Sequence, residues 1–255
     1  MIRSALFYPV LVLSTGVFSI LAVLLTRIGG GPAVVDWIGR NWARSLLVAA
    51  GVRVSVRGLE HLDRPGPQVI VANHQSYFDV WALMAALPVS VRFVAKGELA
   101  GIPLLGRAMR DAGHVLIDRK RPRSAKETLR TAGRRMRAEG LTLVLFPEGT
   151  RSRDGELGRF RRGSFALALE TGVPLVPAAL DGGRRAYPPG AKRLRPGRIV
   201  VRLARPISLE GVDPPSRDAL MREARRAIES MLGEGGESSS RPESPDRATC
   251  SAGKG

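Results

Sequence analysis

The sequence contains a single cysteine, Cys250, and only three histidines among 255 residues. One cysteine excludes an intrachain disulfide framework, a cysteine-rich zinc site and an iron–sulfur cluster. The histidines are His61, His74 and His114, and no HExxH sequence is present, so a metal site built from histidines is not expected. These absences exclude the commonest metal-based and disulfide-based architectures.

The charge is strongly one-sided and is carried by arginine. There are 40 basic against 23 acidic residues, a net charge of +17, and only five of the basic residues are lysine. Such a balance predicts an anionic partner: nucleic acid, anionic lipid or a phosphorylated substrate. Arginine's planar fork suits phosphate recognition, although a GC-rich genome would produce the same bias. No aromatic-studded strands, helix-turn-helix or zinc module are recognisable, so we expect no nucleic-acid partner.

The first part of the chain predicts association with a membrane. Ser4–Thr26 contains no charged residue and is bracketed by Arg3 and Arg27. As a helix it would be about 35 Å long, enough to cross a hydrocarbon core of about 30 Å. A signal peptide or a buried core helix would also be apolar, but the stretch is long for the first and lacks a polar face for the second.

A single span and a hairpin in one leaflet both remain open. Pro9 and Gly16 weaken the first helix, and a Gly-Gly-Gly-Pro break at 29–32 precedes a second, amphipathic stretch that carries tryptophans and arginines. We expect the strongly basic remainder of the chain on the cytoplasmic side of the cell membrane.

From residue 52 the pattern alternates between short apolar runs and helical segments. This alternation predicts an α/β fold, a mixed, mostly parallel sheet covered by helices. The expected organisation is a membrane segment over 1–50, a catalytic domain over 51–232 and a disordered tail over 233–255. Ser124 and Glu127 form a capping box that predicts a helix start. Strands are expected at 52–56, 69–72, 91–95, 114–117, 141–146, 175–180 and 199–203, and helices at 80–86, 124–139, 165–171 and 217–232.

Two loops at strand ends carry candidate chemistry. The first loop is Asn73–Asp79. His74 in the loop and Asp79 in the first turn of the following helix could come into contact. The carboxylate would then fix the imidazole tautomer in which His74 can act as a general base. A surface histidine beside an N-capping Asp79 would give the same spacing. In the second, Phe146–Ser152, a Glu, a Gly, a hydroxyl and an Arg follow a buried strand. This group could cradle an anion or a polyol, or form a solvated charged turn.

The two loops resemble the first and third motifs of the glycerolipid acyltransferases. Gly113–Arg119 is similar to the second motif of that family, and Val173–Ala178 to the fourth. Phe93–Leu99 is also typical of the family. The four motifs occur in the family's order, and the resemblance covers about residues 50–210.

The resemblance implies a membrane-bound enzyme. It would move a fatty acyl group from acyl-CoA or acyl carrier protein to the sn-2 hydroxyl of lysophosphatidic acid, forming phosphatidic acid. His74 would be the general base, and Asp79 would orient it. The glycerol phosphate would be held by Arg119, Glu148, Gly149, Thr150 and Arg151. Another lyso-lipid, such as lyso-ornithine lipid or a lysophospholipid, is the alternative acceptor.

No acyl-enzyme, metal or tightly bound cofactor is implied. The sequence also argues against an acyl-enzyme, because it has no G-x-S-x-G elbow and its cysteine lies in the expected tail. The two basic stretches at 119–137 and 184–205 are either a solvated surface or a surface that attracts lipid headgroups and the phosphates of the acyl carrier.

Overall fold

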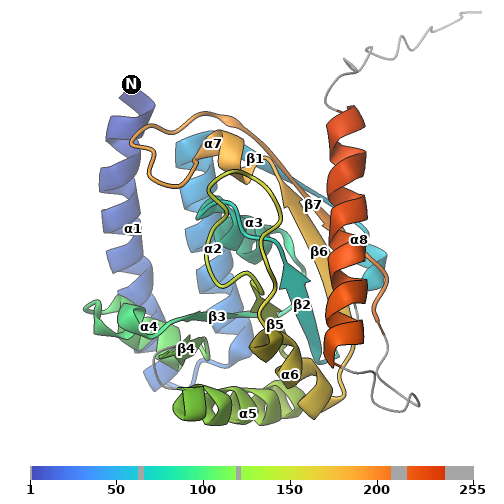
Figure 1. The fold of residues 1–255 in the computed structure, drawn as a ribbon. Coiled ribbons are helices and arrows are strands. Elements are labelled where there is room, and N and C mark those ends of the chain that lie inside the picture. The colour runs from blue at the N-terminus through green and yellow to red at the C-terminus, as the bar shows by residue number, and fades with distance from the viewer. Residues whose placement is uncertain (1, 63–65, 119–121, 208–216, 239–255) are drawn as a thin grey trace, which may run out of the picture.

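A seven-stranded sheet forms the centre of the molecule (Figure 1). The structure, a computed structural model, describes residues 2–62, 66–118, 122–207 and 217–238. All neighbouring strands are parallel except β6 and β7, so the predicted mixed, mostly parallel sheet is confirmed. In the order β1-β7-β6-β2-β5-β3-β4, the strands are β1 Val52–Arg57, β2 Gln68–Ala72, β3 Val91–Lys96, β4 Val115–Ile117, β5 Thr142–Leu145, β6 Leu175–Asp181 and β7 Gly197–Leu203.

Helices cover both faces of the sheet, which explains the continuous apolar runs of its central strands. In β2 the side chain of Ile70 enters one core with α2 and α3, whereas Val69 and Val71 enter a second core with α5, α6 and α8. The helices are α1 Ile2–Arg27, α2 Pro32–Ala50, α3 Phe78–Ala86, α4 Leu105–Asp111, α5 Pro122–Glu139, α6 Arg162–Thr171, α7 Gly183–Ala186 and α8 Arg217–Ser238, with 3-10 turns η1 Leu59–His61 and η2 Gly97–Gly101.

Two local expectations need correction, and two short helices were missed. Helix α5 begins at Pro122, so Ser124 lies inside the helix and the predicted capping box is wrong. Helix α8 continues through Ser238, past the expected end at 232, because a glycine inside a helix costs only about 1 kcal/mol. The short helices α4 and α7 were not predicted, since neither is long enough to show helical periodicity. The rest of the expected tail, with Cys250, lies outside the described residues.

Helix α1 packs against α2, and α2 in turn packs against α3 and the sheet (Figure 1). Helix α1 runs unbroken through Pro9 and is, among the described helices, the one long and apolar enough to cross a membrane. Only 11% of its most apolar stretch is buried, which is consistent with membrane association. The Trp42 indole N–H of α2 donates to Thr15 Oγ1 of α1 at 3.2 Å. The paired helices have the form of a hairpin, and whether α1 spans the membrane stays a prediction.

The two N-terminal helices share the core of the domain. On α2, Leu46 is fully buried against the sheet. On α1, Phe7 is only 2% exposed, and its ring lies 6.1 Å from Phe78 and 5.9 Å from Trp81, both on α3. Removing these helices would therefore uncover apolar surface of the domain.

A polar cluster joins α2 to the sheet. The buried Arg92 on β3 donates to Asp36 Oδ1 on α2 at 2.5 Å, and the Ser90 hydroxyl also donates to Asp36. Nearby, His114 Nδ1 accepts the Phe93 N–H at 3.1 Å. Burial, with a smaller contribution from the Arg92 charge, lowers the pKa of His114 to about 3, so this ring is neutral in the folded protein.

This His114 environment predicts a pH dependence of stability. Because the pKa of His114 is about 3 in the folded chain and 6.5 in the unfolded chain, the unfolded state binds the extra proton, and stability falls as pH falls from about 6.5 toward 3. The contribution approaches about 1.4 kcal/mol per pH unit. His114→Asn keeps an acceptor for the Phe93 N–H and lacks the titration. Denaturant unfolding in detergent should show a shallower pH slope for the variant, and parallel slopes would contradict this assignment.

Candidate active site

Both motif loops emerge at the same edge of the sheet. Strands β2 and β5 are parallel neighbours whose last paired residues are Val71 and Leu145, so the chain leaves both strands side by side. Strand β6, on the other side of β2, delivers α7 to the same edge. Loops at the carboxyl ends of parallel strands are where α/β folds place reactive groups.

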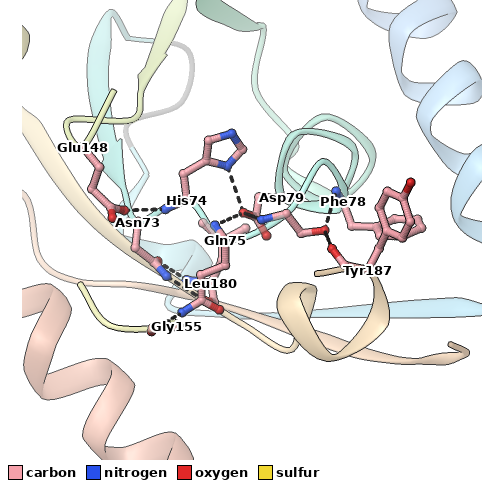
Figure 2. A network of polar contacts seen from close by, with 10 residues as sticks. Asn73, His74, Gln75, Phe78, Asp79, Glu148, Gly155, Leu180 and Tyr187 are labelled. Carbon is pink, nitrogen blue, oxygen red and sulfur yellow. Dashed lines mark hydrogen bonds and ion pairs between the residues drawn. The ribbon is translucent and has the colours of Figure 1, made fainter. Parts of the chain in front are cut away.

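His74 and Asp79 are in contact, as predicted. His74 Nδ1 lies 3.0 Å from Asp79 Oδ2, and the same oxygen accepts the N–H groups of Gln75 at 2.6 Å and Ser76 at 2.7 Å (Figure 2). Asp79 is fully buried in the first turn of α3. Because a carboxylate only accepts, Nδ1 is the ring nitrogen that donates, and in the neutral imidazole the free lone pair is then on Nε2. Asp79 therefore caps the loop N–H groups and also binds the imidazole. Both interpretations of the His74–Asp79 spacing, an N-capping acid and an acid that orients the histidine, thus apply together.

The imidazole is held in place by an aromatic neighbour. The Phe146 ring, which follows β5, stacks on His74 with centroids 4.0 Å apart and planes 17° apart. The Nδ1 contact and this stacking together define the ring plane. The His74 side chain is still 15% exposed, and Nε2 makes no hydrogen bond to any described residue. Nε2 is thus the group of this site that can accept a proton from a bound molecule.

Glu148 joins the two loops. Its Oε1 accepts the His74 N–H at 2.7 Å and its Oε2 accepts the Gly158 N–H at 3.0 Å, while the His74 carbonyl accepts the Ser152 N–H at 2.8 Å. Burial raises the pKa of Glu148, and the two N–H groups oppose that shift. With both oxygens occupied by backbone donors, Glu148 positions His74, and its predicted contact with a glycerol phosphate stays a prediction.

The other predicted binding residues lie around this centre. Gly149 has φ +73°, and a β-carbon there would collide with the Arg161 side chain, so the turn requires glycine. The Arg151 guanidinium lies over the Tyr77 ring, 3.8 Å from its centroid, which places it beside the first loop. Thr150, which follows Gly149 in the second loop, is exposed. Arg119 lies outside the described residues, so its predicted role is untested.

Three further residues support the site and were not singled out from the sequence. Asn73 exchanges two hydrogen bonds with the backbone of Leu180 on β6, at 2.9 and 2.7 Å. Gln75 Nε2 donates to the Gly155 carbonyl at 3.0 Å, and Ser76 Oγ donates to the Tyr187 carbonyl at 2.8 Å (Figure 2). Each bond joins the first loop to a segment distant in sequence, which no local pattern could reveal.

Asp79 Oδ1 has an unusual environment. It is buried and has no hydrogen-bond partner among the described residues. The backbone of α7 closes over it, because a β-carbon at Gly183 would collide with Oδ1 and lie 3.2 Å from the Ser76 β-carbon. Gly183 follows Gly182 directly after β6, and this glycine pair was the available signal for a close approach. All described donors to the carboxylate therefore act on Oδ2.

Comparisons with known proteins identify the same region of the chain. A family model described as "Acyltransferase" matches residues 53–181, which include both loops. The chain is 37% identical to the 1-acyl-sn-glycerol-3-phosphate acyltransferase of Limnanthes douglasii over 63% of this chain and 56% of that protein. It is 36% identical to the human 1-acyl-sn-glycerol-3-phosphate acyltransferase alpha over 71% of this chain and 63% of that protein. The chain thus spans about three fifths of the length of these relatives.

A solved structure has the same fold. The crystal structure of the 1-acyl-sn-glycerophosphate (LPA) acyltransferase from Thermotoga maritima matches with a TM-score of 0.65 and 24% identity. The match covers 91% of this chain and 98% of that chain. A match of this coverage includes at least part of the N-terminal helices as well as the sheet.

The contact between Gly183 and Asp79 predicts the effect of a single methyl group. Gly183→Ala should displace the Asp79 carboxylate, lengthen the contact with His74 Nδ1 and cost about 1–3 kcal/mol of stability through overpacking. The NMR signal of the His74 Nδ1 proton should shift or broaden. The protein has only three histidines, so this signal can be assigned. Gly163→Ala is the control, since its β-carbon meets no atom within 4 Å in α6. An unchanged His74 signal in Gly183→Ala would contradict the contact.

Proposed function

Because the chain belongs to the acyltransferase family, we propose that it transfers a fatty acyl group from a thioester donor, acyl-CoA or acyl carrier protein, to the sn-2 hydroxyl of 1-acyl-sn-glycerol 3-phosphate, forming phosphatidic acid. The relatives that carry this activity in their names support the acceptor. The observation that carries the proposal is the His74–Asp79 pair, with Nε2 left without a partner among the described residues.

In this reaction His74 is the general base. As the acceptor hydroxyl attacks the thioester carbonyl carbon, its proton passes to His74 Nε2. The positive imidazolium is stabilised by Asp79, whose Oδ2 already holds the Nδ1 proton. The carbon–sulfur bond then breaks, the new ester forms, and the proton passes from His74 to the departing thiolate. The step is balanced with no acyl-enzyme, metal or bound cofactor.

Arginine side chains are proposed to hold the acceptor's phosphate. Arg151 forms no ion pair with a described acidic residue, so its charge is available to a ligand beside the first loop. Its guanidinium can bind phosphate oxygens in a bidentate manner. By family resemblance Arg119 would complete this site. Holding the hydroxyl near the thioester would by itself contribute much of the rate.

The enzyme is proposed to act at the cytoplasmic face of the cell membrane. Helix α1 exposes apolar side chains such as Leu13 and Leu24 and is joined to the domain through Phe7. Both the lyso-lipid and the product are amphipathic, so a domain attached to such a helix would meet its acceptor within the bilayer surface. The net charge of +17 favours the leaflet rich in anionic lipid.

The proposed base predicts the effect of two substitutions. His74→Ala should lower kcat about 10²–10⁴-fold, because no other described group replaces Nε2. Asp79→Asn should keep the Gln75 and Ser76 N–H groups satisfied through its amide oxygen and still lower kcat, since the imidazolium loses its counter-charge. Acyl transfer from labelled acyl-CoA to lysophosphatidic acid in detergent measures both. A His74→Ala variant with full activity would overturn the mechanism.

The proposed phosphate site predicts a change in acceptor selectivity. Arg151→Gln should raise the KM for lysophosphatidic acid about tenfold, because it removes a charge-assisted contact with phosphate, and should affect lyso-ornithine lipid little. Arg205→Gln is the charge-matched control, because Arg205 follows β7, which runs antiparallel to β6 and ends at the opposite edge of the sheet. Equal effects of Arg151→Gln on both acceptors, or preferred turnover of lyso-ornithine lipid by the unaltered protein, would contradict the assignment.

A further inference from the structure

A basic depression lies beside the site and has no part in the chemistry described above. It has a volume of about 690 Å³ and is formed by α7 and the segment that leads to β7. Its charged lining consists of five cations and no acid, and we call it the basic basin: Arg184, Arg185, Lys192, Arg193 and Arg195.

Most of the basin's charge is uncompensated. Arg185 pairs with Asp181 at 3.0 Å. In contrast, the exposed side chains of Lys192, Arg193 and Arg195 form no ion pair with any acidic residue in the described ranges. Like charges held this close repel one another, so their arrangement favours an anionic ligand that carries more than one charge.

The basin borders both loops of the active site. Arg184 Nη2 donates to the Arg153 carbonyl at 3.0 Å, in the loop that follows Glu148. At the other end of α7, the Tyr187 carbonyl accepts the Ser76 hydroxyl of the first loop. A ligand bound in the basin would therefore lie next to the two loops that surround His74.

The segment that forms the basin is held against the start of α1, as Figure 1 shows for the loop that follows α7. The Leu194 N–H donates to Ser4 Oγ at 3.0 Å, and the Tyr8 hydroxyl donates to the Lys192 carbonyl at 3.2 Å. These bonds fix the backbone between the cationic side chains, so the basin is built by tertiary contacts and is not a free surface loop.

We propose that the basic basin binds the nucleotide phosphates of acyl-CoA and so directs the thioester of the donor toward His74. This inference rests on the proposed function. A diphosphate and a ribose phosphate on one ligand match a cluster of several cations, whereas the acceptor and the arm of acyl carrier protein each present one phosphate. The pantetheine arm is uncharged, so it can leave the basin and extend along the apolar and aromatic side chains beside the first loop.

The test uses two donors that differ in their phosphates. The triple variant Lys192→Gln/Arg193→Gln/Arg195→Gln should raise the KM for acyl-CoA at least tenfold and leave the KM for an acyl-N-acetylcysteamine thioester, which has no phosphate, unchanged. The control Arg205→Gln/Arg222→Gln/Arg226→Gln removes the same charge from exposed positions elsewhere and should change neither. Equal KM changes for both donors, or none, would overturn the proposal.

Two further measurements separate the remaining outcomes. The first measures binding of the triple variant to vesicles that contain anionic lipid. If the variant binds these vesicles more weakly than the unaltered protein while its KM for acyl-CoA in detergent is unchanged, the basin binds lipid headgroups and the proposal is wrong. The second is CoA binding by calorimetry, which separates the basic-basin proposal from the proposed acyl-transfer function. Protein that binds CoA through the basin but transfers no acyl group to lysophosphatidic acid would contradict the proposed function alone. Absence of CoA binding would contradict the basin assignment.

Discussion

One carboxylate oxygen, Asp79 Oδ2, determines the geometry of the site. It gathers the N–H groups of Gln75 and Ser76 and the Nδ1 proton of His74 at the start of α3. The N-terminal end of a helix already favours negative charge there. The carboxylate oxygen that shapes the loop is thus the one that also orients the imidazole of His74, the proposed base. Since Oδ1 is enclosed by α7 without a described donor, every described hydrogen bond to the carboxylate is made by Oδ2.

The loop depends equally on bonds from two neighbouring strands. Glu148, after β5, holds the His74 backbone from one side, and Asn73 bonds to Leu180 of β6 from the other. The partners are 74 and 107 residues apart in sequence. These bonds tie the loop to two strands of the sheet. The proposed general base catalysis depends on the placement of His74, which these bonds help to fix.

The fold was accessible from the sequence because the sheet is buried on both faces. Runs such as 69–72 and 141–146 read as strands for that reason, and the His74–Asp79 contact followed from a loop histidine and an acid in the first helical turn. What remained hidden depends on distant contacts. The sequence does not show that both Glu148 oxygens are occupied by backbone donors, or that Gly183 lies against Asp79. Helices of one or two turns, α4 and α7, carry too little periodicity to be found.

The burial of Phe7 has a consequence for how this protein responds to its surroundings. The ring at the start of α1 sits against Phe78, the residue beside Asp79 and the first of α3. A tilt or shift of α1 would therefore press on α3, the helix that carries Asp79. Bilayer thickness and lateral pressure act on an exposed apolar helix of this length. If α1 lies in the membrane, as proposed, the physical state of the bilayer can in this way alter the placement of the proposed base and its carboxylate.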